Sequence, residues 1–140
     1  MAHIFVSYAR EDIEMAKGVV DLLQSEGFDV WWDHKLRGGE HYPTRIKDII
    51  KNCAHVIVLW SNHSVASEWV QLEAREAKSK LVPLQISSCE LPGEFRELHT
   101  IQFKEWPQVL RELYSVIRHG RQTFELDFLA DCHQSVIHRK

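Results

Sequence analysis

The chain has 140 residues, of which 44% are hydrophobic and 26% are charged, and its formal net charge at pH 7 is −3. This length and composition fit one globular domain with enough apolar material for a core. The small negative charge gives no electrostatic reason to expect nucleic acid or an anionic membrane as the main partner.

The use of histidine and cysteine argues against a metal centre. None of the nine histidines stands in an HExxH or CxxC–HxxxH spacing, so a zinc site is rejected. The three cysteines, Cys53, Cys89 and Cys132, are scattered, which is typical of a reducing compartment. We find neither a signal peptide nor an apolar run of membrane-spanning length, and we therefore expect a cytoplasmic location.

The first part of the chain alternates between strand and helix patterns. A strand is predicted over Ile4–Tyr8, and Asp12 is the expected N-cap of a helix that ends at Gly27. A second strand over Phe28–Trp32 leads into a loop rich in charge and glycine, Asp33–Pro43.

The middle of the chain repeats this alternation. Thr44 is the expected cap of a helix that turns apolar residues inward, and His55–Trp60 reads as a buried strand. Ser64 or Ser67 then caps a third helix that continues to Lys80.

The last elements are weaker in sequence. A fourth strand, Leu81–Ile86, is predicted at or near an edge of the sheet because it contains Pro83. A short helical turn over Glu94–Leu98 and a weak fifth strand over Thr100–Phe103 follow. The last predicted helix has Pro107 in its first turn and is closed by Gly120.

Alternating strands and helices imply parallel pairing through right-handed crossovers. We predict an α/β fold with a five-stranded parallel sheet in the flavodoxin-like order 2-1-3-4-5 and helices on both faces. Residues 1–120 form the predicted domain. Residues 121–140 are either one more helix or a connector to a sensor domain that this chain does not contain.

The third helix carries one charge on its apolar side. At about 100° per residue, its apolar residues fall within a sector roughly 140° wide, and Glu73 lies inside that sector. The apolar residues are Ala66, Trp69, Val70, Ala74, Ala77 and Leu81, and the polar Glu68, Gln71, Arg75 and Lys78 lie opposite. An inward carboxylate costs several kcal/mol unless it is paired, protonated or in a polar cleft. Glu73 is therefore either half of a structural ion pair or a carboxylate held for chemistry.

Ligands of such sheets bind beyond the carboxyl ends of the strands, where the strand order reverses. Here we expect a crevice between strands one and three, with Glu73 and basic residues near it. Its expected lining residues are Tyr8, Ala9, Arg10, Trp60 and Ser61, with Lys35 and Arg37 close by. The chain has neither GxGxxG nor GxxxxGK(S/T), which excludes the usual dinucleotide and triphosphate cradles.

In these motifs the chain resembles a bacterial-type Toll/interleukin-1 receptor (TIR) domain over about residues 1–120. The resemblance rests on four motifs in the right order along the predicted fold. They are Phe5–Tyr8, Gly27–Asp33, Leu36–Glu40, and the series Ser61, Ser64, Ser67–Trp69 and Glu73.

The resemblance implies an NAD⁺ glycohydrolase or cyclase that cleaves the nicotinamide–ribose bond. Glu73, four residues after Trp69, matches the catalytic glutamate of such enzymes. NAD⁺ is then the substrate, and no separate cofactor is expected. The resemblance also implies an effector of anti-phage defence, fused to or associated with a sensor and activated by self-assembly into oligomers or filaments.

The resemblance further implies contacts with the substrate. Trp69 walls the site or belongs to the core, and Tyr8, Ala9 and Arg10 meet the adenosine or the phosphates. Trp32 and Asp33 border the nicotinamide side, and Ser61 lies at the rim, where it is expected to cap rather than to act as a nucleophile. Lys35, Arg37 and Gly38 lie in the Asp33–Pro43 loop, which covers the substrate and contacts the next protomer.

Two other functions stay open at this point. One is a TIR scaffold without enzymatic activity that only self-associates through the Asp33–Pro43 loop. The other is an enzyme like the nucleoside deoxyribosyltransferases, which would use a carboxylate on free nucleosides and leave NAD⁺ untouched.

Overall fold

The computed structural model of the protein describes residues 3–32, 39 and 41–119. The strands are β1 (His3–Ser7), β2 (Asp29–Trp31), β3 (His55–Trp60), β4 (Leu81–Gln85) and β5 (Ile101–Gln102). The α-helices are α1 (Ile13–Ser25), α2 (Tyr42–Asn52), α3 (Glu68–Ala77) and α4 (Trp106–His119). Short 3₁₀ turns are η1 (Arg10–Asp12), η2 (Ser64–Ala66), η3 (Lys78–Lys80) and η4 (Gly93–Phe95).

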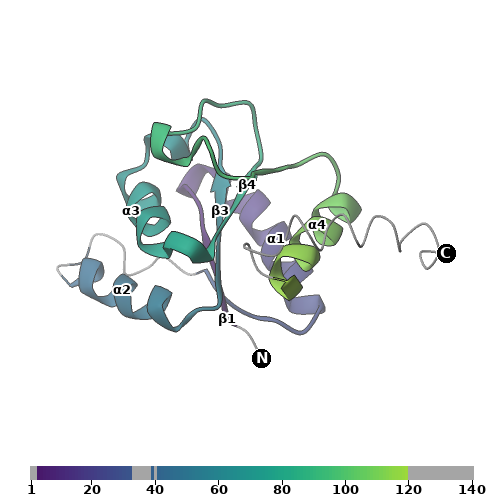
Figure 1. Ribbon diagram of the computed structural model, residues 1–140, viewed down its shortest axis with the longest axis horizontal. Coiled ribbons are helices and arrows are strands. Elements are labelled where there is room, and N and C mark those ends of the chain that lie inside the picture. The colour runs from purple at the N-terminus through teal and green to yellow at the C-terminus, as the bar shows by residue number, and fades with distance from the viewer. Residues whose placement is uncertain (1–2, 33–38, 40, 120–140) are drawn as a thin grey trace.

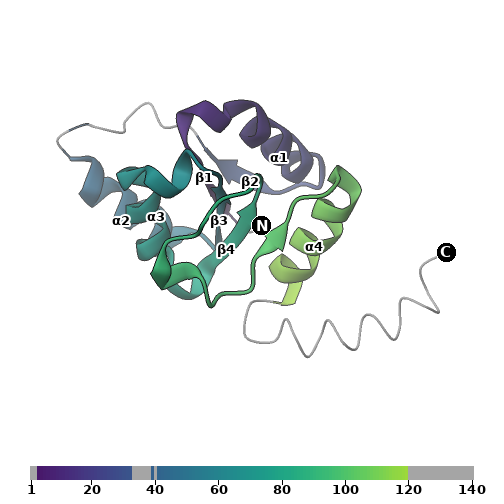
Figure 2. The same ribbon diagram turned by 90° about the horizontal axis from the view of Figure 1, so that it is seen from above.

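The strands form one parallel sheet in the order β2-β1-β3-β4-β5, as predicted. Helices α2 and α3 cover one face of the sheet, and α1 and α4 cover the other (Figures 1 and 2). This arrangement confirms the doubly wound α/β fold.

Side chains of the central strands alternate between two apolar clusters. Val56, Val58 and Trp60 of β3 face α2 and α3, whereas Ile57 and Leu59 face α1 and α4. All five are buried, and burial of an aliphatic side chain of this size contributes about 1.5–3 kcal/mol. The central strands are apolar on both sides because helices cover both faces.

Two predicted helix ends are confirmed. Gly27 has a φ of 91°, a left-handed value that glycine adopts without steric cost, and it ends α1. At the start of α3 the Ser67 hydroxyl accepts a hydrogen bond from the Val70 N–H at 3.3 Å. The third helix therefore begins at the second of its two candidate caps.

Other helix ends differ in part from the predictions. Helix α2 begins at Tyr42, two residues before the predicted cap Thr44, because Pro43 fits the first turn of a helix. Asp12 occupies the N-cap position of α1, as predicted, but its carboxylate makes no capping bond and accepts a hydrogen bond from Ser61 instead. Helix α3 ends at Ala77 because Lys78 takes a φ of 51°.

Strand β1 begins and ends one residue earlier than predicted, and β2 and β4 are shorter than predicted. Tyr8, Trp32 and Ile86 therefore lie just beyond the ends of β1, β2 and β4. Strand β4 lies one position in from the edge strand β5. The Ile86 N–H bonds to Trp60 on β3, so by alternation the nitrogen of Pro83 points toward β5. Because β5 pairs only from Leu84 onward, the missing N–H costs no ladder bond.

The predicted helix or connector over residues 121–140, and closure of the last helix at Gly120, lie outside the described residues. Among the residues that are described, no helix is long and apolar enough to cross a membrane.

Candidate functional site

Glu73 is completely buried, and hydroxyl groups reach both of its carboxylate oxygens. The side chain has 0% exposure. Ser7 Oγ donates to Oε1 at 2.6 Å, and the Tyr42 hydroxyl donates to Oε2. A buried carboxylate requires such donors, because leaving it without them costs several kcal/mol.

Three elements bring this cluster of Ser7, Tyr42 and Glu73 together. Ser7 is the last residue of β1, and alternation from Phe5 turns it toward α2 and α3. Tyr42 is the first residue of α2 and is 2% exposed. Glu73 lies in the middle of α3 on its buried side, as the helical projection predicted. The acid therefore sits at the carboxyl end of the central strand β1.

Aromatic rings border the cluster on one side. Trp69 lies one turn before Glu73 on α3, and its ring meets that of Tyr42 edge to face, with 4.8 Å between the ring centroids. Trp69 is half-buried, whereas Tyr42 is buried. A chain of contacts therefore runs from the carboxylate through Tyr42 to a partly exposed indole.

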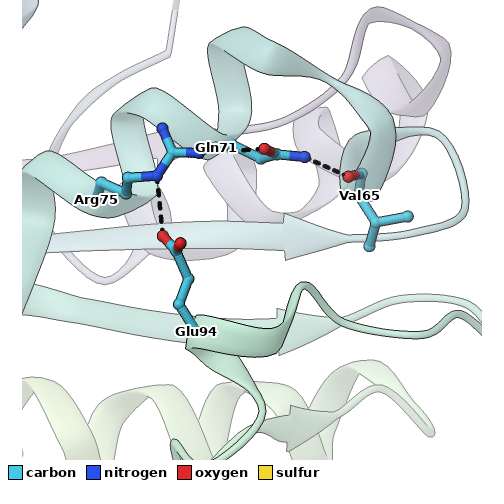
Figure 3. A network of polar contacts seen from close by, with 4 residues as sticks. All are labelled: Val65, Gln71, Arg75 and Glu94. Atoms are coloured by element: carbon cyan, nitrogen blue, oxygen red, sulfur yellow. Dashed lines mark hydrogen bonds and ion pairs between the residues drawn. The ribbon is translucent and has the colours of Figure 1, made fainter.

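Polar contacts on the outer side of α3 fix the orientation of this helix (Figure 3). Arg75 bonds to Glu94 at 2.9 Å and to Gln71 at 3.2 Å. Gln71 in turn donates to the Val65 carbonyl at 2.6 Å. An exposed ion pair of this kind contributes only about 0–1 kcal/mol to the free energy of unfolding, so its main effect is geometric. The ion pair ties α3 to η4, and the Gln71 bond ties it to the turn that precedes the helix.

Serine hydroxyls form hydrogen bonds with backbone groups just beyond the end of β3. Ser61 Oγ donates to the Asp12 carboxylate at 2.5 Å and accepts from the N–H groups of His63 and Ser64, both at 3.1 Å. Ser64 Oγ donates to the Leu59 carbonyl at 2.7 Å. These hydroxyls satisfy backbone groups where the strand turns into the helix, in agreement with the expected capping role.

The structure separates the other predicted site residues. Tyr8 and Trp32 belong to the apolar cluster under α1 and α4, with ring centroids 6.1 Å apart. Ala9, the residue after Tyr8, is also buried. Arg10 is exposed at the start of η1. Trp69 is linked to Glu73 through Tyr42.

The remaining predicted residues, Asp33, Lys35, Arg37 and Gly38, lie outside the described residues, as does most of the predicted assembly loop. Their contacts with substrate or with a neighbouring protomer stay predictions. The crevice between strands one and three likewise stays a prediction.

A model of the TIR domain family matches residues 4–114, which is most of the chain. The chain belongs to the TIR domain family. A comparison with curated protein sequences finds no significant match.

Solved structures agree with the fold of this TIR domain. The TIR domain of a Toll-related receptor from Hydra magnipapillata has a TM-score of 0.73 and 20% identity, with 84% of this chain and 99% of that chain covered. A metazoan TIR-STING receptor from C. gigas gives 0.65 and 24% identity over 84% of this chain and 39% of that one. A CMP N-glycosidase from Clostridium botulinum gives 0.57 and 18% identity, covering 80% and 97%.

Sequence reasoning missed two residues of the TIR domain's buried cluster, Ser7 and Tyr42. Ser7 did carry a signal, since it is a hydroxyl at an inward position of an otherwise apolar strand. Tyr42 carried none, because the sequence assigned it to the loop before the helix, and its contact with Glu73 spans 31 positions.

Other nucleophilic groups of the TIR domain are poorly suited to chemistry. Burial raises the pKa of the Cys53 thiol, and burial together with the nearby Asp12 carboxylate raises that of Cys89. Both thiols therefore stay protonated at neutral pH. Within the described ranges, no three His, Cys, Asp or Glu side chains are grouped as metal ligands would be.

Proposed function

We propose that this TIR domain cleaves the nicotinamide–ribose bond of NAD⁺ and that Glu73 is its catalytic carboxylate. The observation that carries the proposal is a fully buried glutamate with a hydroxyl donor on each oxygen, at the carboxyl end of the central strand β1. An apolar residue would fill this position at no desolvation cost. A scaffold that only self-associates has no use for the acid.

The chemistry requires little besides one carboxylate. The nicotinamide ring is cationic while it is bound to the ribose and leaves as a neutral base, so its departure needs no general acid. A negative charge beside the ribose then stabilises the oxocarbenium-like transition state and accepts hydrogen bonds from the sugar hydroxyls. Capture of the ribosyl group by water gives ADP-ribose, and capture by a nucleophile within the substrate gives a cyclic product.

Substrate contacts follow from the residues around the acid. Trp69 is best placed to border the reacting sugar, because it is linked to Glu73 through Tyr42 and is partly exposed. Arg10 is an exposed cation beyond the end of β1 and suits the phosphates. The proposal keeps Lys35, Arg37 and Gly38 as contacts from the loop before α2. It also keeps Tyr8 and Trp32, which lie just beyond the ends of β1 and β2 and pack under α1 and α4.

Activation by assembly is part of the proposal. The chain acts as an effector, in defence against phage, when a fused or associated sensor brings copies together through the Asp33–Pro43 loop. We expect specific activity to rise more than linearly with protein concentration or crowding. A specific activity that stays constant from dilute to packed protein would contradict this.

Base release from NAD⁺ and from nucleosides, measured at high protein concentration, tests the reaction. Wild-type protein should release nicotinamide from NAD⁺, and Glu73→Gln should lower the rate about 10²–10³-fold because the negative charge is lost. Glu76→Gln is the matched control, since Glu76 lies on the same helix and its carboxylate is 4.0 Å from Lys47. It should keep the wild-type rate.

The same measurement separates the two alternatives. Release of base from nucleosides with NAD⁺ inert would indicate the deoxyribosyltransferase-like reaction. Turnover of neither substrate would indicate the scaffold.

A further inference from the structure

We propose that the two hydroxyls on Glu73 have different roles in the reaction. Ser7 positions the carboxylate throughout, whereas Tyr42 holds the other oxygen only until a hydroxyl of the substrate ribose replaces it. This inference rests on the proposed function and names how the same site admits its substrate.

A sugar can reach Glu73 only if a side chain that covers it moves. The Glu73 side chain is completely buried, and each oxygen already accepts a hydrogen bond from a hydroxyl. A ribose hydroxyl that reaches the carboxylate would be a donor of the same kind. Replacing one hydroxyl by another leaves the carboxylate with its hydrogen bonds, so the exchange avoids the cost of an unsatisfied buried charge.

Ser7 is the donor that stays. It ends β1, which lies between β2 and β3, and it pairs in register with Val58 of β3. Its side chain has a single heavy-atom torsion, so Oγ stays close to the backbone of β1 in every rotamer and its position depends mainly on that strand. Ser7 therefore fixes the direction of the carboxylate relative to the sheet.

Tyr42 is the donor that can leave. Its backbone N–H bonds to the Gly39 carbonyl at 3.1 Å, but its hydroxyl stands at the end of a long side chain with two torsions and can move while the backbone stays in place. Its ring packs edge to face on the partly exposed Trp69, so the contacts outward from Glu73 run through this ring. Movement of Tyr42 frees Oε2 and opens the side of the carboxylate that leads toward solvent.

Steady-state kinetics of NAD⁺ cleavage with concentrated full-length chain distinguish the two roles. Ser7→Ala should lower kcat about 10- to 100-fold, because a donor to a charged group that acts in the transition state is lost. Tyr42→Phe keeps the ring and removes the hydroxyl that competes with the substrate, so it should lower KM about 3- to 10-fold. A purely structural role would reduce the active fraction in both variants without separating kcat from KM.

Matched controls and a second variant keep the test decisive. Ser115→Ala removes a buried serine hydroxyl on α4, and Tyr114→Phe removes an exposed phenol there; both should keep wild-type kinetics. If Ser7→Ala does not fold, Ser7→Cys retains the shape of the side chain with a weaker donor. Its kcat should fall below that of wild type, but by less than the fall predicted for Ser7→Ala. Near-ultraviolet circular dichroism gives the folded fraction of each variant.

The outcomes separate this inference from the proposed function. An active wild type in which both variants change the same parameter, or in which Tyr42→Phe raises KM, overturns the division of roles alone. A wild type that releases no nicotinamide at any concentration overturns the proposed function and this inference with it.

Discussion

The two faces of the sheet are built on different principles. Under α1 and α4 the buried cluster consists of hydrophobic residues, and Tyr8 and Trp32 lie at the carboxyl ends of the strands. Under α2 and α3 a hydrophobic cluster of similar size also surrounds Ser7 and Glu73. Both faces provide hydrophobic stability, but among the described residues a fully buried charged side chain is found only on the second face.

This difference separates what stabilises the fold from what serves function. Replacing a buried charged group and its partners by apolar residues is often neutral or stabilising, so such a group is weak evidence for a role in stability. The cluster of Ser7, Tyr42 and Glu73 is therefore better explained by chemistry than by folding. If that explanation holds, changing the cluster to an apolar one should abolish function and leave the fold intact.

The largest effect is expected where the polar cluster is broken in part. Ser7→Ala alone should lower the free energy of unfolding by about 1–3 kcal/mol, because one carboxylate oxygen loses its donor inside the protein. The triple variant Ser7→Ala, Tyr42→Phe and Glu73→Met removes donors and acceptor together and should be at least as stable as wild type. Urea unfolding curves of the three proteins give these values. A triple variant less stable than Ser7→Ala would show that the cluster itself stabilises the fold.

A smaller effect of opposite sign is expected from a buried hydroxyl on α4. Ser115 Oγ is buried and finds no hydrogen-bond partner among the described residues. Ser115→Ala should raise the free energy of unfolding by about 0.5–1 kcal/mol, because the unpaired hydroxyl is removed and alanine favours the helix. Thermal unfolding measures this, with the exposed Ser25→Ala on α1 as the comparison. A loss of stability would mean that the hydroxyl has a partner in solution.

The smallest effect concerns pH. Burial lowers the pKa of His55, the nearby Lys80 charge lowers it further, and a hydrogen bond with the Ile117 backbone opposes the shift. The unfolded chain then binds the proton more readily than the folded one. The contribution of neutral His55 to the free energy of unfolding is therefore present above the unfolded pKa of about 6.5, and it is lost as pH falls from there toward the folded value. His55→Gln should flatten the decline in stability between about pH 7 and 5, as measured by denaturant unfolding at several pH values. An unchanged slope would contradict the assignment.

Much of the fold could be predicted because it depends on local patterns. Apolar runs such as His55–Trp60 identified the strands, and Gly27 and Ser67 identified helix ends through backbone geometry that involves only neighbours. The inward position of Glu73 followed from the helical period alone. A predicted contact failed where a long-range partner competed with a local one: the Asp12 carboxylate stands at the N-cap position of α1 but bonds to Ser61 instead of the helix backbone.

The sequence by itself determined the order of the elements, the family and the burial of one acid on an apolar helix face. Only the tertiary structure decided what meets that acid. Ser7 and Tyr42 lie 66 and 31 positions away from it along the chain, and they reach it because the parallel sheet sets β1 beneath α3 and α2 alongside it. Periodicity reports which way a side chain points, whereas the partner it finds there depends on how separate elements pack.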